Sequence, residues 1–172
     1  SIDKPLLNRA LRGTYPPGST FKPFMAMAAL NSGKRAAGTV IHDGGSFVFG
    51  NHTFRSHGDH GLGPVDMVRS IVKSSNVYYY SLANGLLPST AWKKKAYKKA
   101  EQQRWYAGET ISLGIGQGYN SFTMLQLASA TATLVAGGPR FEPRLVREIE
   151  AAVKGTRSRP KAETLPPLPY DP

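Results

Sequence analysis

The chain has 172 residues, 40% of them hydrophobic, which is enough for one domain with a core and argues against disorder throughout. It contains no cysteine, so disulfides, thiolate nucleophiles and cysteine zinc sites are excluded. The net charge of +11 favours an acidic partner, such as nucleic acid, an anionic membrane surface or an acidic polymer, without choosing among them.

The sequence contains no apolar run of the length that a membrane-spanning helix needs, and no basic-then-apolar leader stands at Ser1. The first residue is not methionine. We therefore expect a piece of a longer protein, with any membrane anchor outside this chain.

The first predicted helix covers Phe21–Leu30, because its apolar residues approximate a 3.6-residue period. It follows the irregular segment Pro16–Gly18 and ends at a stop signal, Asn31–Gly33. Ser19 and Lys22 are three residues apart at its start, so their side chains share one face and can meet. Free N–H groups at a helix start also favour negative charge. A hydroxyl beside an amine is a nucleophile beside a base.

The Ser-x-x-Lys spacing is a weak signal by itself, since it occurs again at Ser70–Lys73 and Ser158–Lys161. It is also typical of a serine N-cap followed by a solvated lysine in the first turn. The Pro/Gly segment before Ser19, the helix after it and a second polar motif downstream distinguish this copy.

The Gly-rich stretch Ala36–Gly63 predicts loops with short strands at Thr39–His42 and Ser46–Phe49. It contains the four histidines and two nearby aspartates: His42, His52, His57, His60, Asp43 and Asp59. Imidazole and carboxylate are zinc ligands, but the fixed spacing of a known metal motif is missing. We therefore predict no metal site.

The segment Pro64–Asn84 predicts a helix that is interrupted at Lys73–Asn76, because a Ser/Ser/Asn insert has low helix propensity. The small polar residues there have two interpretations. They cap the second helix, or Ser74 and Asn76 face a cleft and offer a hydroxyl and an amide to a ligand.

A basic, aromatic cluster follows at Trp92–Lys99, within a possible helix over Ala91–Ala100. Lysines interleaved with aromatics occur on nucleic-acid surfaces, but no nucleic-acid motif accompanies them here. A solvated basic face is the simpler interpretation, and we predict that nucleic acid is not a partner.

The next stretch predicts a strand at Glu109–Leu113, a glycine loop at Gly114–Gly118 and a helix over Thr123–Val135, which Ser121 or Thr123 caps and Gly137–Gly138 ends. Strand, glycines and helix is also the layout of a dinucleotide-binding turn. The third glycine, the acidic residue and any phosphate-loop motif are missing, so no nucleotide cofactor is predicted.

The last part of the chain predicts a strand at Leu145–Ile149 and then a Pro/Arg-rich linker or tail over residues 154–172. That composition disfavours regular structure.

Two pairs of residues, Ser19-x-x-Lys22 and Ser74-x-Asn76, match in order two of the three motifs named for penicillin-binding proteins and class A β-lactamases. Longer stretches match as well: Pro5–Ala10, Pro16–Phe24, Leu113–Tyr119 and Leu125–Ala128. With these motifs the chain resembles a class B penicillin-binding protein, of the penicillin-binding protein 2 type that acts as the D,D-transpeptidase of cell elongation.

The resemblance implies an α/β (α+β) fold, the penicillin-binding transpeptidase or serine β-lactamase-like domain, with an antiparallel sheet flanked by helices. Residues 1–153 would hold a partial domain, mostly its helical part. The implied activity is cross-linking of peptidoglycan stem peptides through a serine acyl-enzyme, with no cofactor and with β-lactams as inhibitors. Ser19 would be the nucleophile and Lys22 its base, while Ser74 relays a proton and Asn76 holds the substrate amide.

The resemblance also implies a location at the periplasmic face of the bacterial inner membrane. The implied partners are a membrane glycosyltransferase and other elongation proteins.

Two features depart from the family. No Lys-Thr-Gly or Lys-Ser-Gly motif is present, since Lys154–Thr156 has the wrong order, and the segment near Gly85 is short. We therefore expect a partial transpeptidase domain with little activity by itself. A β-lactam sensor or non-catalytic scaffold of the same fold, and a basic nucleic-acid-binding module, remain as alternatives.

Overall fold

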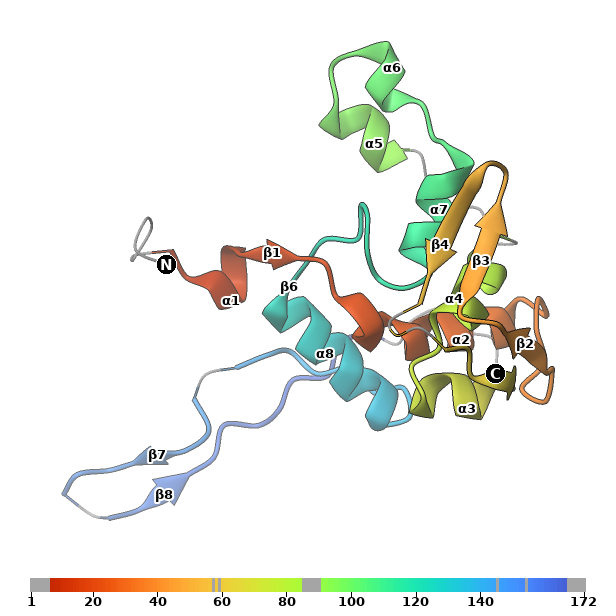
Figure 1. The fold of residues 1–172 in the computed structure, drawn as a ribbon. Coiled ribbons are helices and arrows are strands. Elements are labelled where there is room, and N and C mark those ends of the chain that lie inside the picture. Colours follow the sequence, from red (N-terminus) through yellow and green to blue (C-terminus); the bar gives the residue numbers. More distant parts are fainter. Residues whose placement is uncertain are drawn as a thin grey trace. The chain divides into compact units, whose positions relative to one another are not determined.

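The computed structural model describes residues 7–56, 58, 60–84, 91–144, 146–153 and 155–166. The chain divides into two compact units. Tyr15–Ser121 forms one, which we call the site unit, and Ser1–Thr14 with Phe122–Pro172 forms the other, which we call the terminal unit. Figure 1 shows the fold as a ribbon coloured along the sequence from the N-terminus to the C-terminus.

The site unit contains a 3₁₀ helix, six α-helices and four strands among its described residues. They are η1 (Gly18–Phe21), α2 (Lys22–Asn31), β2 (Ile41–Asp43), β3 (Ser46–Phe49), β4 (His52–Arg55), β5 (Gly63–Val65), α3 (Met67–Val72), α4 (Asn76–Ala83), α5 (Ala91–Ala96), α6 (Ala100–Gln103) and α7 (Ala107–Leu113).

The described elements of the terminal unit are shorter, apart from one long helix. They are α1 (Arg9–Arg12), β6 (Phe122–Thr123), α8 (Met124–Val135), β7 (Ile149–Glu150) and β8 (Arg157–Ser158). Strand β1 (Thr14–Tyr15) lies where the chain passes from this unit into the site unit.

The predicted helix over Phe21–Leu30 is confirmed, with the turn η1 leading directly into α2. Pro23 lies in the first turn of α2, where the missing N–H costs little. The helix ends as expected, because Gly33 adopts a φ of +65° just after it. Ser19 therefore lies in the 3₁₀ turn, and Lys22 is the first residue of α2.

The strands form two-stranded antiparallel pieces. The predicted strand Ser46–Phe49 is confirmed as β3, and it pairs with β4 in a hairpin whose turn contains Gly50 at a φ of +60°. The strand expected at Thr39–His42 is shifted to β2, which pairs with β5 from Ile41 opposite Val65.

The interrupted helix is confirmed as α3 and α4, but its predicted start at Pro64 is wrong. Pro64 lies in β5 opposite His42, and α3 begins only after Asp66, whose carboxylate accepts a hydrogen bond from Arg69 N at 2.7 Å. Pairing with a distant strand therefore overrode the local apolar pattern.

The strand expected at Glu109–Leu113 is also wrong, because these residues belong to α7. The Glu109 carboxylate accepts a hydrogen bond from Tyr106 N at 3.0 Å, which stabilises the start of a helix. Ile111 is then fully buried in the core on the side of α7 that packs against α4.

The core lies within the site unit, and α4 contributes more residues to it than any other element. It consists of Ala26, Ala29, Val65, Met67, Tyr78, Tyr79, Tyr80, Leu82, Ile111 and Ile115. In the terminal unit, α8 has the predicted N-cap, Thr123, and the predicted glycine stop, but no residue of α8 is buried.

The C-terminal stretch has more regular structure than its composition indicated. Strand β8 pairs with β7, placing Ile149 opposite Ser158, so residues 157–158 contradict the expectation of no regular structure after residue 153. The strand predicted over Leu145–Ile149 is reduced to β7, and Leu145 lies outside the described residues. The short segment near Gly85 and Lys154 also lie outside the described residues.

Candidate active site

The structure brings together the four residues that the sequence singled out. The Lys22 amine points at the junction between α3 and α4, where Nζ donates to Ser74 O at 2.6 Å, Ser74 Oγ at 2.9 Å and Asn76 Oδ1 at 2.8 Å. Ser74 Oγ donates to Ser19 Oγ at 3.0 Å. A continuous hydrogen-bonded chain therefore joins the Lys22 amine to the Ser19 hydroxyl, and Ser74 is its middle member.

Burial gives the Lys22 amine an unusual acidity. The side chain is 1% exposed, and its three hydrogen-bond partners are oxygens of uncharged groups. Burial disfavours the ammonium form and lowers the pKa of Lys22 from 10.5 to about 8, although the charge of Asp43 partly opposes this by raising it. At pH 7 about one amine in ten is therefore neutral and able to accept a proton.

Ser74 has a backbone conformation that few non-glycine residues adopt. Its φ is 53°, in the left-handed region, which costs of the order of 1–3 kcal/mol unless surrounding contacts compensate. Lys22 supplies such contacts, because it binds both the carbonyl and the hydroxyl of Ser74. The left-handed turn ends α3 and directs the hydroxyl toward Ser19.

A buried carboxylate supports the same junction from the other side. Ser75 caps α4 by accepting from Tyr78 N at 3.1 Å, and its hydroxyl donates to Asp43 Oδ2 at 2.5 Å. Asp43 Oδ1 also accepts from Gly45 N at 2.8 Å. The capping interpretation of the polar insert is confirmed for Ser75, while Ser74 and Asn76 contact the Lys22 amine, and their predicted role toward a ligand stays a prediction.

The glycine loop after α7 contacts the turn that holds Ser19, a role that sequence reasoning missed. Gly18 N donates to Gly116 O at 2.9 Å. Gly116 has a φ of +73°, and a Cβ there would lie 2.1 Å from Gly18 O. Glycine is therefore required at position 116 by both conformation and space, and the Gly114–Gly118 pattern was its signal in the sequence.

Comparison with known proteins identifies the family. Residues 1–167 match the family model described as the penicillin binding protein transpeptidase domain. This chain belongs to that family. It is 36% identical over 183 residues to peptidoglycan D,D-transpeptidase MrdA of Haemophilus influenzae, and the match covers 88% of this chain and 28% of that protein.

Solved structures of transpeptidase family members show the same fold. PBP2 of Pseudomonas aeruginosa superimposes with a TM-score of 0.76 at 34% identity, over 98% of this chain and 42% of that one. A peptidoglycan synthase complex, described as coordinating polymerization and crosslinking, gives a TM-score of 0.74 at 30% identity, over 97% of this chain and 32% of that one. The resemblance to the PBP2 type and the expected α/β transpeptidase fold are thus confirmed, and this chain spans less than half the length of either match.

The other two Ser-x-x-Lys copies lie in different surroundings from the copy at Ser19–Lys22. The Ser70 hydroxyl is buried and donates to Met67 O at 2.7 Å, while Lys73 is exposed. Ser158 and Lys161 are both exposed in the terminal unit. Among the three serines, Ser19 is the one that is hydrogen-bonded to the Ser74–Lys22 chain.

The remaining sequence candidates divide into three groups. In the described part of the chain, no three His, Cys, Asp or Glu side chains group together as they would around a metal ion, and His57 and Asp59 lie outside that part. None of the helices in the described ranges has the length and apolarity to span a bilayer. In the lysine cluster, Lys94, Lys95, Lys98 and Lys99 are exposed as expected, but Lys93 is 2% exposed, so the solvated-face interpretation is wrong for that residue.

Proposed function

We propose that this chain is part of a peptidoglycan D,D-transpeptidase that cross-links stem peptides through a serine acyl-enzyme during cell-wall elongation. The observation that carries the proposal is the hydrogen-bonded chain from Lys22 through Ser74 to Ser19, with a buried amine whose pKa is about 8. The activity named for the Haemophilus relative supports the same reaction.

In the proposed acylation, Ser19 Oγ attacks the carbonyl carbon of the penultimate D-Ala of a stem peptide. The neutral Lys22 amine takes the hydroxyl proton, and the Ser74 hydroxyl between them passes it on. The bond from that carbonyl carbon to the nitrogen of the terminal D-Ala then breaks. The leaving nitrogen receives a proton back through Ser74, and D-Ala departs.

In the proposed second half, an amine from a neighbouring stem peptide attacks the acyl-enzyme carbonyl carbon and loses a proton to Lys22. The bond from that carbon to Ser19 Oγ then breaks, and Ser19 Oγ receives the proton from Lys22 through Ser74. Asn76 holds the Lys22 amine with its side-chain oxygen, which leaves its NH₂ group for a substrate carbonyl. A β-lactam resembles the D-Ala-D-Ala terminus and would stop at the acyl stage. The chemistry needs no cofactor.

The location and partners belong to the same proposal. We place the protein at the periplasmic face of the inner membrane, working with a membrane glycosyltransferase and other elongation proteins. The likeness to a peptidoglycan synthase complex that couples polymerization and crosslinking supports a glycan-polymerising partner. The comparisons do not favour the nucleic-acid alternative.

We further propose that residues 1–153 are a partial transpeptidase domain and that residues 154–172, which include strand β8, form a linker or tail. The missing Lys-Thr-Gly motif supports this assignment, because the family uses it to hold the substrate carboxylate and to help stabilise the oxyanion. Loss of one oxyanion donor costs about a hundredfold or more in rate. Activity therefore has to be measured on the full-length product of the gene.

The test uses that full-length protein, a fluorescent penicillin and intact-mass analysis. One adduct is expected on the wild type, none on Ser19→Ala, and one on the matched control Ser158→Ala, whose serine is exposed and remote in sequence. An adduct that persists in Ser19→Ala contradicts the assignment of the nucleophile.

A cross-linking assay with stem peptides then separates the enzyme from its nearest alternative. A transpeptidase releases D-Ala and joins two stem peptides. Acylation by penicillin without any joined product would instead indicate a β-lactam sensor or a scaffold of the same fold.

A further inference from the structure

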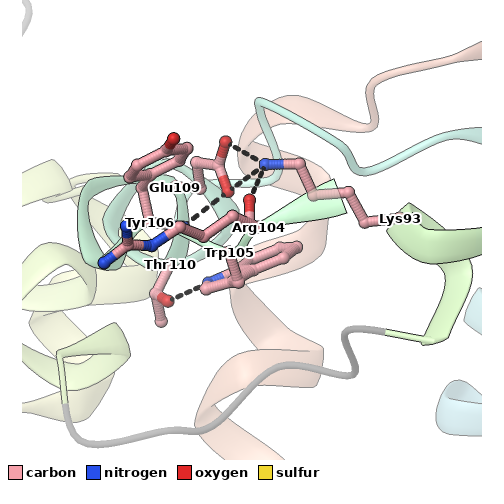
Figure 2. A network of polar contacts seen from close by, with 6 residues as sticks. All are labelled: Lys93, Arg104, Trp105, Tyr106, Glu109 and Thr110. Atoms are coloured by element: carbon pink, nitrogen blue, oxygen red, sulfur yellow. Dashed lines mark hydrogen bonds and ion pairs between the residues drawn. The ribbon is translucent and has the colours of Figure 1, made fainter. Parts of the chain in front are cut away.

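A second buried lysine lies in the site unit, outside the proposed catalytic group. Lys93 Nζ donates to both carboxylate oxygens of Glu109, at 2.5 and 2.7 Å, and to Arg104 O at 2.6 Å, as Figure 2 shows. Three aromatic rings lie around the same amine, with centroids 4.9–5.6 Å from Nζ: Tyr119, Tyr106 and Trp105. The site is built to hold one cation.

The charge on Lys93 is stabilised rather than suppressed. Burial lowers the pKa of Lys93, but the hydrogen bonds and charge of Glu109, with a further contribution from Tyr119, outweigh burial and raise the pKa above its usual value. Its neighbour Lys94 is exposed, although both belong to the same helix, α5. Lys93 is therefore a permanently charged anchor, and not a base.

Lys93 contacts both ends of the segment 104–119. Arg104 and Glu109 lie at the N-terminal end of the segment 104–119, and the Tyr119 ring lies at its C-terminal end. The Glu109 carboxylate also accepts from Tyr106 N and so stabilises the first turn of α7. Figure 2 shows a further link, in which Trp105 Nε1 donates to Thr110 Oγ1 at 2.9 Å.

The segment held in this way carries two closely packed glycines, of which Gly116 contacts the Ser19 turn. At the end of α7, Gly114 approaches α4 so closely that a Cβ would lie 2.6 Å from Tyr79 O. Two residues later, Gly116 O accepts the hydrogen bond from Gly18 N, directly before Ser19. Lys93 is therefore connected to the Ser19 turn through its contact with Glu109, the short helix α7 and the hydrogen bond between Gly116 and Gly18.

We infer that Lys93 and Glu109 are positioning residues for Ser19, acting through α7 and the carbonyl of Gly116. This inference rests on the proposed function, since the effect on rate is an effect on acylation at Ser19. The physical reason is that a nucleophile must be held within a fraction of an ångström, and a misplacement of 1 Å costs about a hundredfold in rate. The ion pair holds the far end of the segment against which the Ser19 turn is fixed.

The experiment compares Lys93→Met, Glu109→Gln and the double variant with the matched control Lys94→Met, all in the full-length protein. Two quantities are measured on the folded fraction of each variant. The first is the rate constant of acylation by a fluorescent penicillin at saturating concentration, and the second is the hydrogen-exchange rate of the Gly18 amide.

The expected result is that either single change slows acylation by about tenfold, a smaller loss than a full ångström of misplacement would cause. Exchange of the Gly18 amide becomes faster, and Lys94→Met changes neither quantity. The double variant loses no more than the worse single variant, because both changes break the same contact. Glu109→Gln keeps the shape and one acceptor oxygen, so it serves if Lys93→Met does not fold.

Wild-type acylation and wild-type Gly18 exchange in a folded Glu109→Gln variant would overturn the inference, even if its melting temperature fell. Additive losses in the double variant would also contradict it. The exchange measurement does not depend on acylation. If the wild type failed to acylate, the proposed function would fall, while faster Gly18 exchange in the variants would still support the positioning role.

Discussion

The site unit contains two almost completely buried lysines whose surroundings give them opposite character. Lys22 is 1% exposed among uncharged oxygens, and its pKa falls to about 8. Lys93 is 2% exposed against the Glu109 carboxylate, and its pKa is raised. The comparison shows that burial alone does not decide whether the pKa of a lysine falls. The direction of the shift depends on whether a carboxylate binds the amine directly.

The position of Asp43 illustrates the same point. This carboxylate lies close enough to raise the Lys22 pKa, but its oxygens bind Ser75 and Gly45 rather than the amine. Its charge therefore raises the pKa of Lys22 by less than burial lowers it. A direct ion pair of the kind that Lys93 makes would keep Lys22 protonated.

The largest expected difference between the two lysines is in acylation rate. Replacing Lys22 with Met removes the proposed base and should slow acylation of Ser19 by about 10³-fold. The matched change Lys93→Met should cost about tenfold, because it acts only on position. Stopped-flow measurement with a fluorescent penicillin compares them, with the exposed Lys34→Met as control. Equal losses of acylation rate in Lys22→Met and Lys93→Met would contradict the different roles proposed for the two lysines.

The next effect concerns the glycine loop Gly114–Gly118, which lies between the Lys93–Glu109 ion pair and the Ser19 turn. Gly116→Ala places a Cβ 2.1 Å from Gly18 O and forces a side chain onto a φ of +73°. The Ser19 turn has to shift, and acylation should fall by about 10²-fold. Gly137→Ala is the matched control, because its φ of +72° brings a similar strain while its Cβ would meet no atom within 4 Å. The same acylation loss in both variants would mean that strain alone is responsible.

The pH dependence of acylation should follow Lys22 and not Lys93. In the proposed mechanism the neutral amine is the active form, so the rate should rise with pH to a midpoint at about 8 and fall about tenfold for each pH unit below it. In Glu109→Gln the midpoint should stay the same while the plateau is lower. A midpoint that moved with Glu109→Gln, or one near the 10.5 of an unperturbed lysine, would contradict the assignment.

The smallest expected effect is a shift in the midpoint of the pH dependence of acylation. Since the Asp43 charge raises the Lys22 pKa, Asp43→Asn should move the midpoint below its wild-type position. Acylation at pH 7 would then be limited less by protonation. The exposed change Glu101→Gln should leave the pH profile in place. An upward shift in Asp43→Asn would show that the carboxylate acts on Lys22 in some way other than through its charge.

Much of the fold and of the candidate site could be predicted because the signals are local. The helix after Pro16–Gly18, the break at Lys73–Asn76 and the cap at Thr123 all follow from residues within one or two turns of each other. Two of the errors, at Pro64 and at Glu109–Leu113, arose where local patterns were ambiguous. In the first, pairing with β2 decided the structure, and in the second, a capping carboxylate and the burial of Ile111 decided it.

By itself, the sequence determined the family, the candidate nucleophile Ser19, and the set of polar residues around it. Only the tertiary structure placed Ser74 between Ser19 and Lys22, set Gly116 against Gly18, and separated Lys93 from the exposed lysines beside it. The physical reason is that the pKa and position of a side chain depend on its burial and on partners from distant parts of the chain. Spacing along the sequence specifies neither.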